Sequence, residues 1–312
     1  MTELAVIAHP DCEVHEPQPG HPERPARIQA VMSGLNQLDS LRELTARAAD
    51  REQLLLAHRG SYVDRLLALE QELGPDTPTT SLDPDTHVGH GSVRAARMAA
   101  GAVCQGVDDT NARSGQPAFA AVRPPGHHAT ADRAMGFCLF NSIAVAAEYA
   151  LNKGGSRKVA ICDFDVHHGN GTEEIFAGRR EVLFVSSHQL PLYPGSGDPD
   201  QPSAANIHNA ALTPGSGSDQ FRDAWKGRLL DRIDRFGPDL ILISAGFDAH
   251  WRDPLAELEL KDEDFFWIGH QLKMLADTHA DGRLVASLEG GYDLKALTDS
   301  ALAFAEGITF TH

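Results

Sequence analysis

Short apolar runs alternate with longer amphipathic segments along almost the whole chain, and this alternation is the feature that most restricts the fold. The strand-like runs are Leu4–Ala8, Ala118–Val122, Val159–Ile161, Val182–Val185, Leu240–Ile243 and Leu284–Ser287. Helix-like stretches lie around residues 23–37, 61–72, 91–107, 141–152, 219–236, 262–280 and 293–306. Strands connected by helices are typical of a mostly parallel sheet that helices cover on both faces. The sequence therefore predicts an α/β fold.

The same pattern indicates one domain rather than two. The chain has no internal repeat and no linker, and α/β folds often exceed 250 residues as one unit. The stretch richest in Pro, Gly and Ser, Pro191–Ser203, lies between strand-like runs and is interpreted as a functional loop. Residues 1–312 are therefore expected to form a single domain. Residues of the type that cap helices predict four helix N-caps, at Ser92, Asn141, Ser218 and Asp262.

Nearly every unusual polar cluster follows directly after a strand-like run. The clusters are RPPGHH after Val122, CDFDVHHGNG after Ile161, SSH after Val185, SAGFDAH after Ile243 and EGGYD after Leu288. Ligands of open α/β sheets bind outside the carboxyl ends of the strands. The five clusters are therefore expected to converge at one edge of the sheet.

Charge and composition exclude several classes of protein. The chain has 27 basic and 44 acidic residues, so its net charge is 27 − 44 = −17, which argues against nucleic acid or an anionic membrane surface as a partner. No apolar run approaches the ~20 residues that span a bilayer. No two of the four cysteines have a zinc-like spacing, and Leu4–Ala8 is too short for the apolar core of a signal peptide. A cytoplasmic protein with reduced thiols is expected.

The segment after Ile161 and the aspartate after Ile243 suggest a metal site. In an extended segment, Asp163, Asp165 and His167 point to one side, because side chains alternate with a period of two. Asp165, His167 and Asp248 would supply three ligands with open positions, which suits a catalytic Zn²⁺ and, less well, Fe²⁺. A polar turn explains the glycines that follow but not three ionisable groups on one face. Asp248 alone would be interpreted as a helix N-cap, and the first cluster makes the metal site the stronger interpretation.

The paired histidines His127 and His128 are candidates for acid–base chemistry. They follow a rigid Pro-Pro-Gly turn, which is a poor way to fill a core, and histidine titrates near neutral pH. Asp163 and Asn170 are natural partners for the two rings. A charged partner raises the pKa of a histidine more than a neutral one does, so the two imidazoles are expected to differ in role. A second pair of metal ligands is the alternative use of the two histidines.

Three aromatic residues complete the candidate site. Tyr292 follows two glycines at a strand end, from where its hydroxyl can reach into the site, although a lone tyrosine is more commonly a half-buried structural residue. Phe137 and Tyr193 are expected to line a narrow apolar channel, whereas each on its own would be assigned to the core.

Together, these residues resemble the zinc-dependent histone deacetylase superfamily. The superfamily includes bacterial acetoin-utilisation proteins, acetylpolyamine amidohydrolases and histone deacetylase-like amidohydrolases. The matching stretches are HPERPARI, RPPGHHA, GFCLFNSIAVAA, DFDVHHGNGT, SAGFDAHWRDPL and LEGGYDL, which extend from His21 to Leu294. Asn170 and the SAGFDA motif resemble the class II branch of the superfamily. The resemblance implies an arginase-like domain with a central parallel sheet of about eight strands.

The resemblance also implies a role for each matching residue. It makes Asp165, His167 and Asp248 the zinc ligands, His127 and His128 the catalytic pair supported by Asp163 and Asn170, and Tyr292 the donor to the substrate carbonyl. It places Phe137, Tyr193 and Gly136 at the acyl-chain tunnel and Arg27 at an internal cavity below the zinc. It implies a structural K⁺ bound by Asp163, Asp165, His167, Ser186 and Ser187, and a second K⁺ near the carbonyls of Phe176, Arg179 and Val182. The family often carries a rim aspartate, which falls near Val88 here, with Asp83 and Asp85 close by.

The expected activity is therefore zinc-dependent hydrolysis of an acylated amine, most readily Nε-acyl-lysine, by metal-activated water. Leu255 lies seven residues after Asp248, where polyamine deacetylases of the class IIb type carry a glutamate, so a small-molecule or peptide acyl-lysine is favoured over an acetylpolyamine. A two-metal ureohydrolase would need carboxylates at positions occupied by Gly169 and His250. A silent acyl-binding protein is the third hypothesis, and a homo-oligomer is compatible with all three.

Overall fold

A computed structural model describes residues 2–311 of the protein, and its centre is an eight-stranded parallel sheet. The strands are β1 (Leu4–Ala8), β2 (Leu41–Thr45), β5 (Ala118–Ala120), β6 (Val159–Asp163), β7 (Val182–Gln189), β8 (Ile207–Leu212), β9 (Leu240–Ala245) and β10 (Leu284–Leu288). They lie in the order β2-β1-β5-β10-β9-β6-β7-β8. The α/β fold with a parallel eight-stranded sheet is therefore confirmed.

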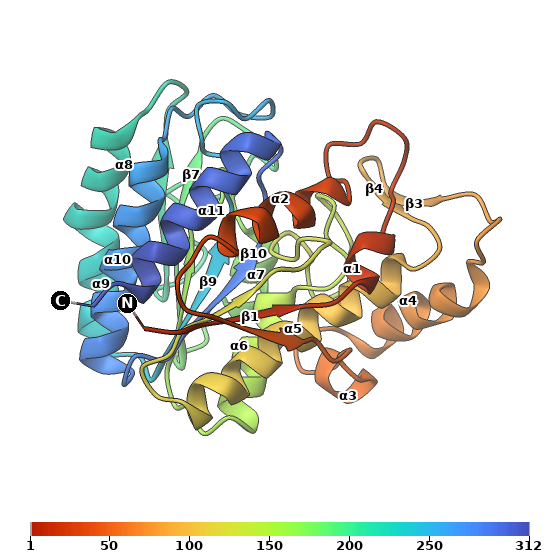
Figure 1. Cartoon of the computed structure of the whole chain (residues 1–312), viewed down its shortest axis with the longest axis horizontal. Coiled ribbons are helices and arrows are strands. Elements are labelled where there is room, and N and C mark those ends of the chain that lie inside the picture. Colours follow the sequence, from red (N-terminus) through yellow and green to blue (C-terminus); the bar gives the residue numbers. More distant parts are fainter. Residues whose placement is uncertain (1, 312) are drawn as a thin grey trace.

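Helices cover both faces of this sheet (Figure 1). The helices are α1 (Asp11–Val14), α2 (Ala26–Leu35), α3 (Arg51–Leu54), α4 (Gly60–Glu72), α5 (Ser92–Ala112), α6 (Ser142–Asn152), α7 (Asn170–Phe176), α8 (Ser218–Ala224), η1 (Trp225–Leu229), α9 (Leu230–Phe236), α10 (Asp262–His279) and α11 (Leu294–Thr309). Helices α5 and α6 pack together on one face, and α2, α10 and α11 pack on the other (Figure 1). Every residue of β6, β9 and β10 is buried, because these central strands have helices on both sides.

The sequence pattern missed the two edge strands, β2 and β8. Edge strands are buried less completely, so their sequences are more polar than those of central strands. In β2, Arg42 forms ion pairs with Glu3 and Asp109 at the open edge of the sheet. Three short helices, α1, α3 and α7, were also missed.

Of the four predicted caps, only Asn141 is confirmed, where the side chain accepts a hydrogen bond from the amide of Ala144. The predictions for Ser92, Ser218 and Asp262 are wrong by one residue, because these are the first residues of their helices. The preceding positions, Gly91, Gly217 and Lys261, are the N-caps.

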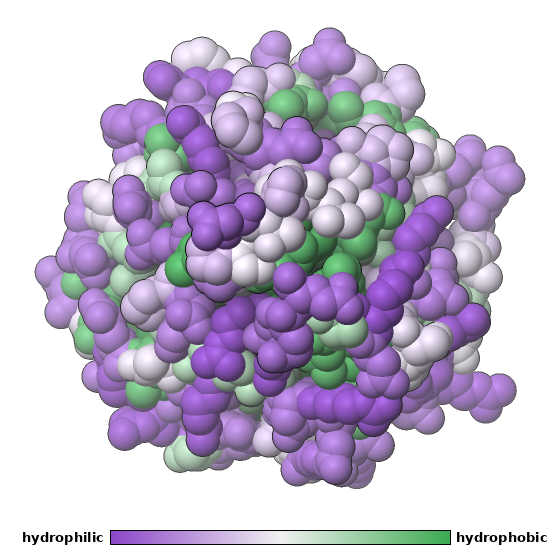
Figure 2. All heavy atoms as spheres, turned by 90° about the vertical axis from the view of Figure 1, so that its right-hand side faces the viewer, coloured by the Kyte–Doolittle hydropathy of each residue, from purple (hydrophilic) through white to green (hydrophobic). Residues whose placement is uncertain are grey.

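A small antiparallel ribbon lies beyond the main sheet. It consists of β3 (Thr80–Asp83) and β4 (Thr86–Val88), and it stands on the side toward which β1 runs (Figure 1). That side carries the carboxyl ends of the parallel strands. Figure 2 views the molecule from there and shows hydrophobic residues gathered near the middle of a largely hydrophilic face.

Among residues 2–311, no helix is both long enough and apolar enough to cross a bilayer. All four cysteines are buried.

Candidate active site

Three buried side chains at the carboxyl ends of β6 and β9 form a compact group. Asp165 and His167 follow β6, Asp248 follows β9, and their candidate ligand atoms all lie within 4.8 Å of one another. The Nδ1 atom of His167 is 3.1 Å from an oxygen of Asp165 and 3.2 Å from an oxygen of Asp248. The other oxygen of each carboxylate accepts a backbone N–H, from Gly290 at 2.7 Å and from Val166 at 2.9 Å. One oxygen of each aspartate therefore remains turned toward the imidazole.

This group fits a divalent cation. Burial raises the pKa of Asp248, and the neighbouring charge of Asp165 raises it further. Burial would lower the pKa of His167, but hydrogen bonds with the two aspartates raise it to about 10. Two carboxylates thus converge on one imidazole nitrogen, in an arrangement that favours positive charge between them. Two carboxylates and one imidazole form the mixed oxygen and nitrogen donor set of many catalytic zinc sites.

Two glycines leave the space that these carboxylates occupy. A Cβ atom on Gly290 would lie 1.9 Å from an oxygen of Asp248, and a Cβ atom on Gly246 would lie 2.1 Å from an oxygen of Asp165. Any larger residue at either position would have to displace a carboxylate. The glycines of SAGFD and EGGYD therefore allow the backbone to pass close to the carboxylates of Asp165 and Asp248.

The two histidines that follow β5 stand next to this group with different partners. The Nδ1 atom of His127 is 3.0 Å from a carboxylate oxygen of Asp163, and the Nδ1 atom of His128 is 2.8 Å from the amide oxygen of Asn170. The two ring centroids are 4.1 Å apart. The structure therefore brings together the pairs that the sequence suggested. Because an amide oxygen only accepts hydrogen bonds, the proton of His128 is on Nδ1, and Nε2 is free to accept one.

The partners separate the two histidines electrostatically. Burial would lower the pKa of His127, but the charges of Asp163 and Asp165 reverse this and raise it to about 10. For His128, burial lowers the pKa, and the neighbouring charges of His127 and His167 lower it further. His127 is thus a stable cation at neutral pH, whereas His128 is neutral.

A carboxylate that sequence reasoning did not single out holds the histidine segment in place. Glu289, the last residue before the Gly-Gly turn, is fully buried, and one of its oxygens accepts the backbone N–H groups of Gly126 and His127 at 2.6 and 3.1 Å. Its position at the start of the EGGYD cluster was the sequence feature that could have identified Glu289 as a site residue.

Tyr292, which follows the Gly-Gly turn after β10, lines the same pocket as the two histidines. Its ring is almost completely buried, and its backbone N–H donates to Asp253 at 2.7 Å. Burial raises the pKa of Tyr292 well above its usual value, so its hydroxyl keeps its proton at neutral pH. The guanidinium of Arg27 packs over this ring at 4.8 Å and donates to the carbonyl of Gly291 at 2.6 Å.

A pocket of about 220 Å³ leads to these groups. Its lining residues are Asp85, Pro125, His127, His128, Gly136, Phe137, His167, Leu192, Tyr193, Leu255, Gly290 and Tyr292. It thus unites the catalytic candidates with the four expected tunnel residues, Gly136, Phe137, Tyr193 and Leu255. Arg27 does not line this pocket, because it is fully buried behind Gly291 and Tyr292.

The rim aspartate is the clearest residue that sequence reasoning could not place. Val88 is buried in β4, whereas Asp85 stands in the turn between β3 and β4 and lines the pocket. An oxygen of Asp85 accepts the N–H of Gly136 at 3.2 Å, and the hydroxyl of Thr86 accepts the N–H of Phe137 at 3.0 Å. Phe137 has a φ of 67°, a strained value for a residue with a side chain, so the β3–β4 turn fixes an unusual backbone in the tunnel wall.

The residues expected to bind potassium fall into two separate groups. Ser186 lies opposite Asp163 in the register of β6 and β7, next to the segment of Asp165 and His167, and Ser187 follows it. In the second group, the side-chain amide of Asn206 donates to the carbonyls of Phe176 and Val182 at 2.8 and 3.0 Å. The carbonyl of Arg179 accepts the N–H of Val182 at 3.3 Å in the same turn.

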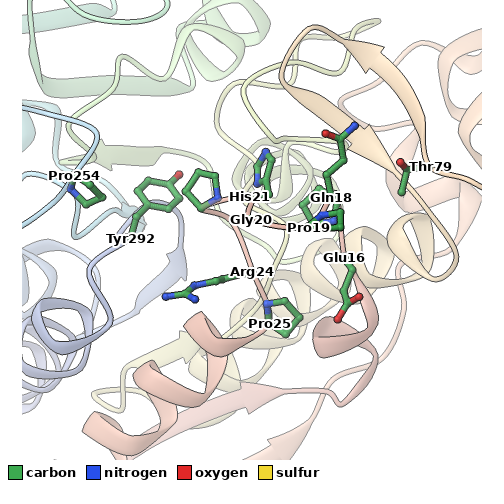
Figure 3. Close-up of a pocket in the computed structure, with 12 residues that line it drawn as sticks. Glu16, Gln18, Pro19, Gly20, His21, Arg24, Pro25, Thr79, Pro254 and Tyr292 are labelled. Carbon is green, nitrogen blue, oxygen red and sulfur yellow. The ribbon is translucent and has the colours of Figure 1, made fainter.

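A second pocket, of about 620 Å³, adjoins the first. Figure 3 shows Tyr292 and Pro254 at one end of it, the proline-rich segment around Pro19 and His21 in the middle, and Thr79 at the other end. Tyr292 lines both pockets, so its ring is the wall between them.

Comparison with known proteins gives concordant results. A family model described as "Histone deacetylase domain" matches residues 21–308. A histone deacetylase-like amidohydrolase of Pseudomonas aeruginosa is 38% identical over 301 residues, covering 93% of this chain and 77% of the relative. A probable deacetylase of Methanothermobacter thermautotrophicus is 37% identical over 315 residues, covering 98% of this chain and 90% of the relative. The crystal structure of the HDA15 HD domain is similar with a TM-score of 0.90 at 33% identity, covering 99% of this chain and 90% of that one.

Proposed function

The chain belongs to the histone deacetylase family, and we propose that it is a zinc-dependent amidohydrolase that removes the acyl group of an acylated amine, with Nε-acyl-lysine as its preferred substrate class. Family membership supports a deacetylase. The single observation that carries the finer proposal is the lining of one pocket: it includes two histidines with opposite charge preferences, a buried tyrosine, and His167 of the candidate metal triad.

Asp165, His167 and Asp248 would hold one Zn²⁺ per chain. When bound, the metal supplies Lewis acidity, which polarises a carbonyl and lowers the pKa of a water molecule. To serve as a ligand, the imidazole of His167 would have to be unprotonated at the nitrogen that faces the two aspartates.

The two histidines divide the work with protons. His128, neutral and with Nε2 unprotonated, accepts the proton of the attacking water and then returns it to the nitrogen of the leaving amine. His127 stays protonated because of Asp163, and its positive charge stabilises the negative charge that develops on the substrate.

Tyr292 completes the site from the other side. Its hydroxyl, which stays protonated, donates a hydrogen bond to the carbonyl oxygen of the scissile amide, where negative charge grows during attack. The ring of Phe137 stands edge-to-face to Tyr292 at 6.0 Å, and that of Tyr193 does so to His128 at 5.2 Å. These rings exclude water and orient the methylenes of the substrate.

Leu255 supports acyl-lysine as the substrate class. It lines the pocket and offers apolar surface but no charge for the internal ammonium of a polyamine. An acetylpolyamine is the second candidate, because the carboxylate of Asp85 also lines the pocket and would attract an ammonium group.

A two-metal ureohydrolase and a silent acyl-binding protein have less support. Within residues 2–311, one group of at least three His, Cys, Asp or Glu side chains has the spacing of a metal site, whereas a two-metal ureohydrolase requires a second set. A silent acyl-binding protein would not need the charge-separated histidine pair.

The proposal has five further parts that concern the whole protein. They are a single catalytic domain over residues 1–312, structural K⁺ beside the zinc ligands, a cytoplasmic location, neither nucleic acid nor membrane as a partner, and a homo-oligomer as a compatible state.

The test is an activity screen of the zinc-loaded protein. Acetyl-lysine peptides, longer acyl-lysine peptides and N8-acetylspermidine would be compared by kcat/KM. We expect the kcat/KM values of the acyl-lysine peptides to exceed that of N8-acetylspermidine. A clear preference for acetylspermidine would overturn the substrate class, and inactivity on all three would overturn the proposed function.

A further inference from the structure

A second pair of histidines, His168 and His188, lies outside the catalytic group and contacts the segment that carries the tunnel wall. We call residues 190–203 the wall loop, because Leu192 and Tyr193 within it line the active-site pocket. Both histidines are buried, and their ring centroids are 4.7 Å apart. Neither ring lines the pocket, so the proposed reaction leaves them without a role.

Each histidine binds one residue of the wall loop. The Nε2 atom of His188 is 3.0 Å from the carbonyl oxygen of Gly197, and the Nδ1 atom of His168 is 2.8 Å from the hydroxyl of Ser196. Both contacts fall three or four residues after Tyr193. The loop is otherwise at the surface, so these are bonds from the interior to an exposed segment.

The rest of the protein fixes the orientation of both rings. Since a carbonyl oxygen only accepts hydrogen bonds, His188 donates from Nε2 to Gly197. Burial lowers the pKa of His188 to about 3, so the ring is neutral. Its Nδ1 atom therefore accepts a hydrogen bond from the hydroxyl of Ser186 at 3.0 Å. The Nε2 atom of His168 is 2.9 Å from Glu173, whose carboxylate also accepts from Asn209 at 2.8 Å. Residues of β7, β8 and α7 thus fix the two imidazole rings that contact the wall loop.

Gly197 is shaped to this contact. It has a φ of +86°, and a Cβ atom there would lie 2.5 Å from Nε2 of His188 and 2.6 Å from Cδ2 of His168. Gly195, two residues earlier, has nearly the same φ, +81°, but a Cβ atom there would meet nothing within 4 Å. The two glycines therefore have nearly the same positive φ and differ in their contact with the histidines.

We propose that His168 and His188 are positioning residues that clamp the wall loop at Ser196 and Gly197 and thereby fix Leu192 and Tyr193 against the substrate. This inference rests on the proposed function and extends it, because it assigns the geometry of one tunnel wall to side chains beneath it. The clamp acts on substrate binding and not on the bond-breaking step.

The matched pair Gly197→Ala and Gly195→Ala tests the clamp. Both substitutions introduce the same backbone strain, but only Gly197→Ala pushes the loop off the histidines. We expect Gly197→Ala to raise KM for an acetyl-lysine peptide by about tenfold with kcat changed less than KM, and Gly195→Ala to resemble the unmodified protein. Equal behaviour of the two variants would overturn the proposal.

A second pair of variants examines the hydrogen bond itself. His188→Phe removes the donor to Gly197, whereas His188→Gln can keep an N–H near that carbonyl, so KM should rise in the first variant and largely recover in the second. Substitution of His168 is avoided because it adjoins His167. If His188→Phe does not fold, the glycine pair decides the question.

Hydrogen exchange of the amides in residues 190–203 supplies a readout that needs no substrate. Exchange should accelerate in Gly197→Ala and His188→Phe and stay unchanged in Gly195→Ala. Unchanged exchange in the first two variants would disprove the clamp even if the enzyme is active. Accelerated exchange in a protein inactive on every acyl-amine would support the clamp and refute only the proposed function.

Discussion

The floor and the wall of the active-site pocket are built in different ways. The floor consists of His127, His128 and His167 at strand ends, together with Asp165 and Asp248, which contact His167, and all five are buried. The wall consists of loop residues, namely Phe137, Leu192, Tyr193 and Leu255, and Tyr193 is 38% exposed. Backbone amides, carboxylates and an amide side chain hold the floor, whereas the wall is held by the β3–β4 turn at Gly136 and Phe137 and by His168 and His188 at the wall loop. Under the proposed function, the side chains at the ends of the sheet strands would carry out the chemistry, and the loops would select the acyl-amine.

The largest fall in activity is expected from loss of the metal from the floor. Asp248→Ala, or removal of the metal with a chelator, should lower kcat by about 10³-fold or more, because several kcal/mol of electrostatic stabilisation is lost. Metal analysis should give about one zinc per chain before treatment and less than that in the variant. Because the proton competes for His167, metal affinity should also fall as the pH decreases.

The exposed residue Asp231, which pairs with Arg235 on α9, provides the control for this variant. Asp231→Ala should keep both zinc and activity. Full activity of metal-free protein would contradict the metal-dependent reaction.

Tyr292→Phe should have the next largest effect. Loss of one donor to a developing oxyanion lowers kcat by about 10²–10³-fold. Zinc content and the binding of the peptide should change little, since the ring and its contact with Arg27 are kept. Turnover close to that of the unmodified protein would mean that another group polarises the carbonyl.

Asn170→Asp should shift the pH dependence of kcat/KM. A carboxylate beside His128 favours the imidazolium and raises the pKa of this histidine. Because the base must be neutral, the acidic limb of the kcat/KM profile should move to higher pH, by about one unit. The activity lost is therefore on the acidic side of the profile, and activity at high pH should be kept. A limb that stays in place would exclude His128 as the base.

The smallest effect is expected at the wall. Leu255→Glu should shift the ratio of kcat/KM values toward N8-acetylspermidine by about fivefold, because an exposed charge pair contributes about 1 kcal/mol at most. Leu255→Gln, which has nearly the same shape as glutamate but no charge, is the matched control and should leave the ratio unchanged. Equal shifts in both variants would show that size and not charge selects the substrate.

The difference between floor and wall also explains what could be predicted from the sequence. Asp163 and Asn170 were expected beside His127 and His128, because both clusters come at or after the end of an apolar strand and strand ends meet at one edge of a parallel sheet. The parallel order and the metal triad follow from the same reasoning.

Phe137, Tyr193 and Leu255 of the wall were expected, whereas Asp85 and Leu192 reach the pocket through distances that no local pattern encodes. Asp85 comes from a two-stranded ribbon of mixed polarity, and its contact with Gly136 joins residues 51 positions apart. Leu192 is one of two leucines in the wall loop, and only the folded backbone reveals that it lines the pocket. The edge strand β2 was missed for a related reason, because the polar residues of an edge interrupt the apolar run.

The place of β10 in the sheet has a consequence for how the protein acquires its activity. Among residues 2–311, β10 is the last strand to be synthesised, yet it pairs with β5 on one side and β9 on the other, and so joins two half-sheets. The histidine pair follows β5 in one half, the triad follows β6 and β9 in the other, and Tyr292 follows β10 itself. A nascent chain that ends before Leu284 therefore has two unjoined sheet edges and a divided catalytic site, a state prone to aggregation. Such distant pairing also slows folding, so we expect activity to appear late, when the last strand enters the sheet.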